Sequence, residues 1–161
     1  MELNKSDLID PIELSQTLIR CPSVTPIEGG ALDELQTVLE RIGFKCTRLV
    51  FSESGTPDVD NLYARIGEDG PNFCFAGHSD VVPPGLSSEW SGDPFSGMIA
   101  DGKLFGRGSS DMKSAIAAFV VAAERFIKEK FDKGRFSISL LITGDEEGPA
   151  INGTVKVLEW M

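Results

Sequence analysis

The sequence predicts a layered α/β domain, in which helices pack against a central sheet. Segments with apolar residues at helical spacing alternate with short apolar runs rich in β-branched and aromatic residues, and turns containing Gly, Pro and Asp separate them. The chain has 161 residues, 41% apolar and 25% charged, which is the size and composition of one ordinary globular domain. Alternation of helices and strands is typical of layered α/β proteins.

Two helices are predicted near the start of the chain. The first begins at Asp10-Pro11, because the aspartate is placed to cap the helix and proline suits a first-turn position. Its apolar residues are Ile12, Leu14, Leu18 and Ile19. The second ends at Gly43, since glycine commonly terminates helices. Its apolar residues, three or four apart, are Leu32, Leu35, Val38, Leu39 and Ile42.

A region rich in strands and turns follows. Three strands are predicted over residues 45–51, 61–66 and 72–76. Residues 83–94 are expected to form a long irregular loop that carries Trp90. Residues 98–105 are expected to form a β-hairpin that turns at Asp101-Gly102.

The last third of the chain again predicts helix, strand and helix. A long amphipathic helix is expected from Asp111 to about Lys130. Its apolar face consists of Met112, Ile116, Phe119, Val120, Ala123, Phe126 and Ile127. A buried strand is expected over residues 136–143, and a final helix from about Gly153.

Acidic residues occur at three positions that end a strand or begin a helix. His78, the only histidine, and Asp80 follow one predicted strand, Glu146 and Glu147 follow another, and Asp111 opens the long helix. Binding groups in α/β sheets collect beyond the carboxyl ends of strands, so these side chains are expected to converge. One imidazole and several carboxylates suit zinc, cobalt or manganese. Asp111 is a candidate bridge between two metals, and Asp80 a candidate partner for the second nitrogen of His78.

Each position also has an ordinary structural interpretation. A lone histidine is commonly just a polar residue, Asp111 could be an N-cap, and residues 145–147 could be a solvated turn. Residues 106–111 approach the dinucleotide pattern G-x-G-x-x-G, but aspartate replaces the last glycine and would repel a pyrophosphate. That motif is therefore rejected. The three acidic positions taken together favour a metal site.

Charge and composition exclude several classes of partner and predict a cytoplasmic location. A net charge of −10 argues against nucleic acid and anionic membranes as partners. Residues 1–7 do not read as a signal peptide, and no apolar run reaches the roughly 18 residues of a membrane span. The three cysteines have no C-x-x-C spacing, so they are expected to be free thiols in a reducing compartment.

Several longer motifs carry a resemblance to a known family. They are GHSDVVP (77–83), WSGDPF (90–95), DGKLFGRG (101–108), SDMK (110–113) and TGDEEG (143–148). In this order they resemble the aminoacylase and carboxypeptidase-type family of di-zinc amidohydrolases. The resemblance covers nearly all of the chain. It implies a layered αβα, zinc-exopeptidase-like catalytic domain with a mixed central sheet.

The resemblance also implies a role for each candidate residue. His78 would bind one metal, Asp111 would bridge two, and Glu147 would bind the second. Glu146 would be the general base for the attacking water, and Asp80 would support His78. The cofactor would be zinc, two ions in a complete site, with cobalt possible. Family members also tend to have a cis peptide bond after the bridging aspartate.

Finally, the resemblance implies that residues 1–161 are the amino-terminal part of a metallohydrolase catalytic domain. Family members supply a further carboxylate and a second histidine beyond this point, together with a lid and dimerisation domain. The chain alone is therefore expected to be incomplete and inactive, and a full-length form to be a homodimer. The substrate would be a small N-acyl amino acid. Its acyl group stays open between related deacylases and peptidases, and a non-catalytic remnant or metal-binding module is the interpretation from another class.

Overall fold

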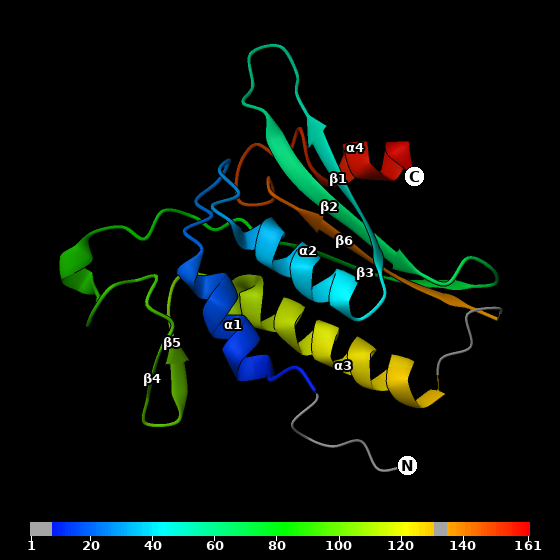
Figure 1. Ribbon diagram of the computed structural model, residues 1–161. Coiled ribbons are helices and arrows are strands. Elements are labelled where there is room, and N and C mark those ends of the chain that lie inside the picture. The colour runs from blue at the N-terminus through cyan, green and yellow to red at the C-terminus, as the bar shows by residue number, and fades with distance from the viewer. Residues whose placement is uncertain (1–7, 131–134) are drawn as a thin grey trace.

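The computed structural model describes residues 8–130 and 135–161 and shows a sheet with helices on both faces (Figure 1). The helices are α1 (Pro11–Arg20), α2 (Ala31–Arg41), α3 (Ser114–Lys130) and α4 (Thr154–Trp160). The strands are β1 (Lys45–Phe51), β2 (Val59–Ile66), β3 (Asn72–His78), β4 (Met98–Ala100), β5 (Lys103–Phe105) and β6 (Ser137–Thr143). The layered α/β fold predicted from the sequence is confirmed.

The main sheet has the order β1-β2-β6-β3 and mixed strand directions. β2 is antiparallel to both β1 and β6, whereas β3 and β6 are parallel and joined through α3. The parallel pair ends in register, with His78 opposite Thr143. Two chain segments 65 residues apart therefore leave the sheet at the same edge.

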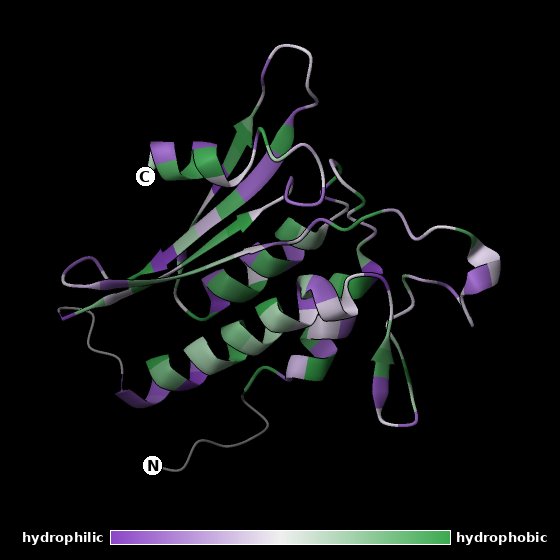
Figure 2. Ribbon diagram, turned by 180° about the vertical axis from the view of Figure 1, so that it is seen from behind, coloured by the Kyte–Doolittle hydropathy of each residue, from purple (hydrophilic) through white to green (hydrophobic). Residues whose placement is uncertain are grey.

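Three helices cover one face of this sheet and form the main core. Alternate residues of β2 and β6 point toward α1, α2 and α3, which contribute apolar faces of their own. The fully buried members are Leu32, Leu35, Leu39, Leu62, Ala64, Ile116, Ala117, Val120, Leu140 and Ile142. Figure 2 shows the matching bands of apolar and polar residues along these helices.

The opposite face carries a smaller cluster beneath α4. Tyr63 and Leu141 point to this side, where Val157 of α4 packs on them. The ring of Trp160 meets Tyr63 edge to face, with centroids 5.6 Å apart. Both faces of β6 are thus covered, and all seven of its residues are buried.

Most predicted elements are found with shifts of one or two residues at their ends. The α1 cap is as predicted, because the Asp10 carboxylate accepts hydrogen bonds from the backbone N–H groups of Ile12 and Glu13. Gly43 follows α2 with a φ of 98°, which favours glycine. Among the described cysteines all are free thiols, although Cys74 on β3 is exposed.

One predicted boundary is wrong. The long helix begins at Ser114 rather than Asp111, because Asp111 has an extended backbone (φ −136°, ψ 102°) and the Asp111-Met112 peptide bond is cis. Asp111 is therefore not an N-cap residue. The cis bond itself agrees with the family resemblance, and residues 109–113 form a separate irregular turn, called here the 109–113 turn.

The predicted hairpin, β4–β5, stands away from the sheet (Figure 1). It is fixed to α1 by Gln16, whose side-chain amide donates to the Gly97 carbonyl at 2.7 Å. A Cβ on Gly106 would lie 2.4 Å from the Ile19 side chain, so this close approach requires glycine. Within residues 8–130 and 135–161, no helix is long and apolar enough to cross a membrane. The prediction concerning a signal peptide at residues 1–7 lies outside the described residues.

Candidate metal centre

The candidate residues are brought together by the parallel pairing of β3 and β6. His78 is the last residue of β3, and the backbone N–H of Ser79 donates to the Thr143 carbonyl at 2.9 Å. Glu146 and Glu147 follow Thr143 by a few residues. The predicted convergence at the carboxyl ends of the strands is therefore present in the structure.

The imidazole of His78 is the centre of the cluster, and its side chain is 6% exposed. Its Nδ1 lies 3.0 Å from the backbone carbonyl oxygen of Asp80. Its Nε2 lies 3.0 Å from Oδ1 of Asp111 and 3.6 Å from Oε2 of Glu146. Possible ligand atoms of His78, Glu146 and Glu147 all lie within 4.8 Å of one another.

This geometry fits a divalent cation. A carbonyl oxygen can only accept, so Nδ1 must carry a proton to hydrogen-bond with Asp80. In a neutral ring, the lone pair of Nε2 then points at carboxylate oxygens that also carry lone pairs. A second ring proton or a metal cation is needed to make that approach favourable. A ligating histidine whose other nitrogen donates to a carbonyl is the usual arrangement in metal sites.

The carboxylate of Asp80 holds the two glutamates through their backbone. Its Oδ1 accepts from the N–H of Glu146 at 3.2 Å, and its Oδ2 accepts from the N–H of Glu147 at 3.0 Å. The carboxylate is 3.6 Å from His78 Nδ1, farther than its own carbonyl. Asp80 thus contacts the ring nitrogen chiefly through its main-chain carbonyl, and its role in supporting a metal-binding His78 stays a prediction. The buried side chain of Asp80 fixes the turn that carries the glutamates.

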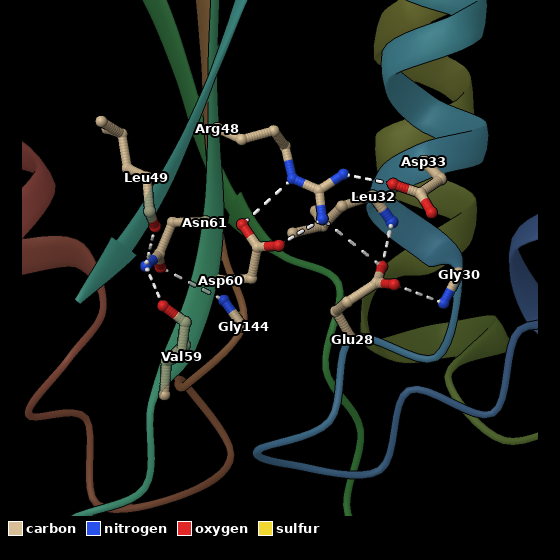
Figure 3. Close-up of polar contacts among 10 residues, drawn as sticks. All are labelled: Glu28, Gly30, Leu32, Asp33, Arg48, Leu49, Val59, Asp60, Asn61 and Gly144. Atoms are coloured by element: carbon tan, nitrogen blue, oxygen red, sulfur yellow. Dashed lines mark hydrogen bonds and ion pairs between the residues drawn. The ribbon is translucent and has the colours of Figure 1, made fainter. Parts of the chain in front are cut away.

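The remainder of the loop after β6 is fixed by two further buried residues. Oδ2 of Asp145 accepts the N–H groups of Ile151 and Asn152 at 2.8 and 2.9 Å. Asn61 on β2 accepts the N–H of Gly144 at 3.4 Å and donates to the Asn152 carbonyl at 3.0 Å. Figure 3 shows the Asn61 side chain donating to the carbonyls of Leu49 and Val59 and accepting the N–H of Gly144. The loop therefore holds its glutamates in a defined place.

Asp111 lies on the 109–113 turn and contacts the same ring nitrogen, Nε2, that faces Glu146. Its side chain is 72% exposed, and its carboxylate reaches the imidazole from solvent. The next residue, Met112, lies against Gly77, and its Sδ accepts the His78 N–H at 3.4 Å. Lys113 is completely buried. Burial lowers the pKa of Lys113 to about 8, opposed by the nearby Cys21 and Asp80.

Negative charge is concentrated at the open side of this cluster. Partial burial raises the pKa of Glu147, and the carboxylates of Asp111, Glu146 and Asp80 raise it further, whereas His78 opposes the change. Like charges this close repel one another unless a cation lies between them. The arrangement is thus suited to binding a cation with the three outer carboxylates and the imidazole.

A second charged group, shown in Figure 3, has a structural role instead. The guanidinium of Arg48 on β1 contacts the carboxylates of Asp60, Asp33 and Glu28. Glu28 also accepts the N–H groups of Gly30 and Leu32 at the start of α2. These contacts join α2 to the β1–β2 hairpin, and all three carboxylates contact the same guanidinium group.

Sequence reasoning identified five residues of the cluster and missed those that hold it. His78, Asp111 and Glu146 are in direct contact, Glu147 lies beside them, and Asp80 is behind the ring. The residues missed are Asn61, Asp145 and Lys113. A signal existed for Lys113, because it precedes Ile116, Ala117 and Val120 at helical spacing and so shares their buried face.

A layered α/β domain with an imidazole and several carboxylates beyond its parallel strands has the organisation of metal-dependent hydrolases. Residues 74–161 match the model of peptidase family M20/M25/M40. The chain therefore belongs to this family.

Curated relatives give closer sequence similarity. The chain is 62% identical over 152 residues to a succinyl-diaminopimelate desuccinylase of Rhodospirillum centenum, covering 94% of this chain and 39% of that protein. It is 63% identical over 150 residues to the protein of that name from Parvibaculum lavamentivorans, covering 93% and 37%. The chain thus spans well under half the length of these relatives.

Solved structures support the fold. Human carnosine dipeptidase 1 superposes with a TM-score of 0.76 at 23% identity, covering 88% of this chain and 33% of that one. An M20 family metallo-carboxypeptidase from Sulfolobus solfataricus gives a TM-score of 0.75 at 22% identity, covering 90% and 33%. At these identities the comparison concerns the fold alone.

Proposed function

We propose that this chain carries the amino-terminal part of the catalytic domain, and with it part of the active site, of a metal-dependent amide hydrolase. The observation that carries the proposal is the imidazole of His78. Its Nδ1 is held by a carbonyl, and its Nε2 faces the carboxylates of Asp111 and Glu146. His78, Asp111 and Glu147 would hold divalent metal, zinc in the first place, with cobalt able to replace it.

The residues of the chain have distinct tasks in this proposal. A bound metal ion supplies Lewis-acid activation of water and of the substrate carbonyl. Glu146 would take the proton of the attacking water and deliver it to the leaving amine nitrogen, since its carboxylate is exposed and close to His78. Asp80 would keep Glu146 and Glu147 in position through their backbone N–H groups.

The substrate proposed is N-succinyl-L,L-2,6-diaminopimelate, which water would split into succinate and L,L-2,6-diaminopimelate. Identities of 58–63% to three proteins named succinyl-diaminopimelate desuccinylase support this choice. It would place the protein in lysine and diaminopimelate biosynthesis in the cytoplasm. Acetylornithine deacetylase or a related metallopeptidase is the neighbouring alternative, and a non-catalytic metal-binding module is the alternative of another class.

Because the chain covers 37–39% of its desuccinylase relatives, the complete activity would need more than these residues. We propose that residues 1–161 form the amino-terminal part of the catalytic domain. Further metal ligands and a lid and dimerisation domain would lie beyond residue 161, and the full-length form would be a homodimer. The 161-residue chain alone would bind metal but turn over little or no substrate.

The test uses protein purified from its source cells, stripped of metal and reloaded with Zn²⁺. Intact mass is measured first, and succinate release from N-succinyl-L,L-2,6-diaminopimelate is then compared with acetate release from N-acetylornithine. Zinc-dependent succinate release at the higher kcat/KM supports the proposal. A preference for N-acetylornithine would favour the deacetylase, and Zn²⁺ binding without turnover of either substrate by a full-length protein would favour the non-catalytic module.

A further inference from the structure

Lys113 is unusual because an ammonium group is buried completely inside the domain. It is 0% exposed and has the largest of the fully buried side chains. Lysine is rarely buried to this extent unless its charge has partners. Its Nζ donates to the backbone carbonyls of Leu18 at 2.8 Å and Cys21 at 2.7 Å.

Those carbonyls belong to the carboxyl end of α1. The Leu18 carbonyl also accepts the N–H of Cys21, and the Cys21 carbonyl accepts the N–H of Ser23. The Lys113 ammonium adds a second, charged donor to each, and a cation at the carboxyl end of a helix suits its dipole. Lys113 therefore ties the 109–113 turn to α1. Gly108 leaves the necessary room, since a Cβ there would lie 3.1 Å from the Lys113 Cδ and 2.7 Å from Val81.

Asp111 depends on this attachment more than the other candidate ligands do. His78 is buried, and the backbone N–H groups of Glu146 and Glu147 donate to the Asp80 carboxylate. The Asp111 side chain is 72% exposed and, among described residues, has an ion pair with His78 alone. Its position is therefore set by the backbone of the 109–113 turn. That backbone is anchored by Met112 at β3 and by Lys113 at α1.

We propose that Lys113 is a positioning residue, whose buried ammonium holds the 109–113 turn against α1 and thereby fixes Asp111 for metal binding. The proposal rests on the proposed metal site. It adds a residue that touches neither metal nor substrate. The alternative is that Lys113 serves only the stability of the fold.

The decisive variant is Lys113→Met, which keeps an unbranched apolar stem, one bond shorter than that of lysine, and removes the three N–H donors. The Leu18 and Cys21 carbonyls then keep only their backbone donors, the N–H groups of Cys21 and Ser23. The 109–113 turn loses the attachment to α1 that Lys113 provides. We expect Zn²⁺ affinity to fall by about 10- to 100-fold, the range found when groups that support metal ligands are removed. The matched control is Leu35→Ala, because Leu35 is also 0% exposed but lies on α2 in the main core.

Zn²⁺ binding to the 161-residue chain is measured by competition with a chromogenic chelator. The temperature is one at which circular dichroism shows every variant folded. A loss in Lys113→Met well beyond that in Leu35→Ala supports the proposal. Affinity equal to wild type, or a loss no greater than that of Leu35→Ala, overturns it.

Two further variants make the result unambiguous. If Lys113→Met does not fold, Lys113→Gln decides, because its stem is one bond shorter and reaches one carbonyl at most. A several-fold loss then supports the proposal, and wild-type affinity overturns it. His78→Ala tests the site itself. If His78→Ala keeps wild-type affinity, the metal site is refuted, whereas loss in His78→Ala alone refutes only the role of Lys113.

Discussion

Replacing Asp80 by asparagine should weaken both the fold and the metal site. The carboxylate accepts two backbone N–H groups, from Glu146 at 3.2 Å and Glu147 at 3.0 Å. Asparagine has nearly the same shape but only one oxygen, so its NH₂ group must face one of these N–H donors. One charge-assisted hydrogen bond is lost and a buried donor is left unpaired.

The size of the effect follows from these contacts. A hydrogen bond to a charged group contributes about 1.5–3 kcal/mol, so Asp80→Asn should lower the free energy of unfolding by about 2–3 kcal/mol. The glutamate turn would shift, and Zn²⁺ affinity should fall by about 10- to 100-fold. Urea unfolding of the metal-free chain measures the first quantity. Competition with a chromogenic chelator measures the second.

Asp145→Asn is the matched control for Asp80→Asn. Asp145 is also almost fully buried and also accepts two N–H groups, but at the far end of the loop and away from His78. Both N–H groups donate to the one oxygen Oδ2, so asparagine can keep both bonds and lose only the charge. Asp145→Asn should therefore cost less stability than Asp80→Asn and much less Zn²⁺ affinity. Unchanged affinity in Asp80→Asn, or an equal loss in Asp145→Asn, would show that Asp80 does not position the glutamates.

Three other outcomes are expected. Glu147→Gln should stabilise the metal-free chain by a few tenths of a kcal/mol at pH 7. The raised pKa of Glu147 means that the fold favours the neutral carboxyl group. The stability gained by Glu147→Gln should therefore shrink as pH falls through that pKa toward about 4.5, the ordinary value of a glutamate. A gain in urea melts that does not change with pH would contradict this. Exposed Cys74 should react with Ellman's reagent before half-buried Cys46, whose pKa burial raises to about 11, and Cys74→Ser should remove the fast phase. Leu140→Ala should cost about 2–5 kcal/mol with little change in the urea m-value, and a loss below 1 kcal/mol would contradict the assigned core.

The sequence predicted most of the fold because its patterns are local. Residues 45–51 form β1 within the predicted limits, since β-branched and aromatic residues lie between clear turn signals. The β4–β5 hairpin turns at Asp101-Gly102, as expected from a short loop with glycine. The site residues could be predicted because most of them directly follow segments with a clear strand pattern, and in the structure the two parallel strands end in register at His78 and Thr143.

The start of α3, the backbone of Asp111 and the contacts of Asp80 could not be predicted, because they depend on residues far apart in the sequence. Helical spacing continues back through Lys113, so nothing local reveals that α3 begins only at Ser114. The backbone of Asp111 and Met112 is instead set by His78 on β3 and by α1, far away in the chain. The carboxylate of Asp80 was expected to face the His78 ring. In the folded chain the backbone N–H groups of Glu146 and Glu147 lie closer to this carboxylate than the ring nitrogen does, and no local sequence pattern indicates that contact.

The central claim is that His78, Asp111 and Glu147 hold a divalent metal ion. Crystals of the 161-residue chain soaked in ZnCl₂ and measured at the zinc absorption edge test it most directly. The account predicts an anomalous peak about 2.0–2.2 Å from Nε2 of His78 and from carboxylate oxygens of Asp111 or Glu147. A strong peak elsewhere, with none at His78 under saturating zinc, would contradict the assignment.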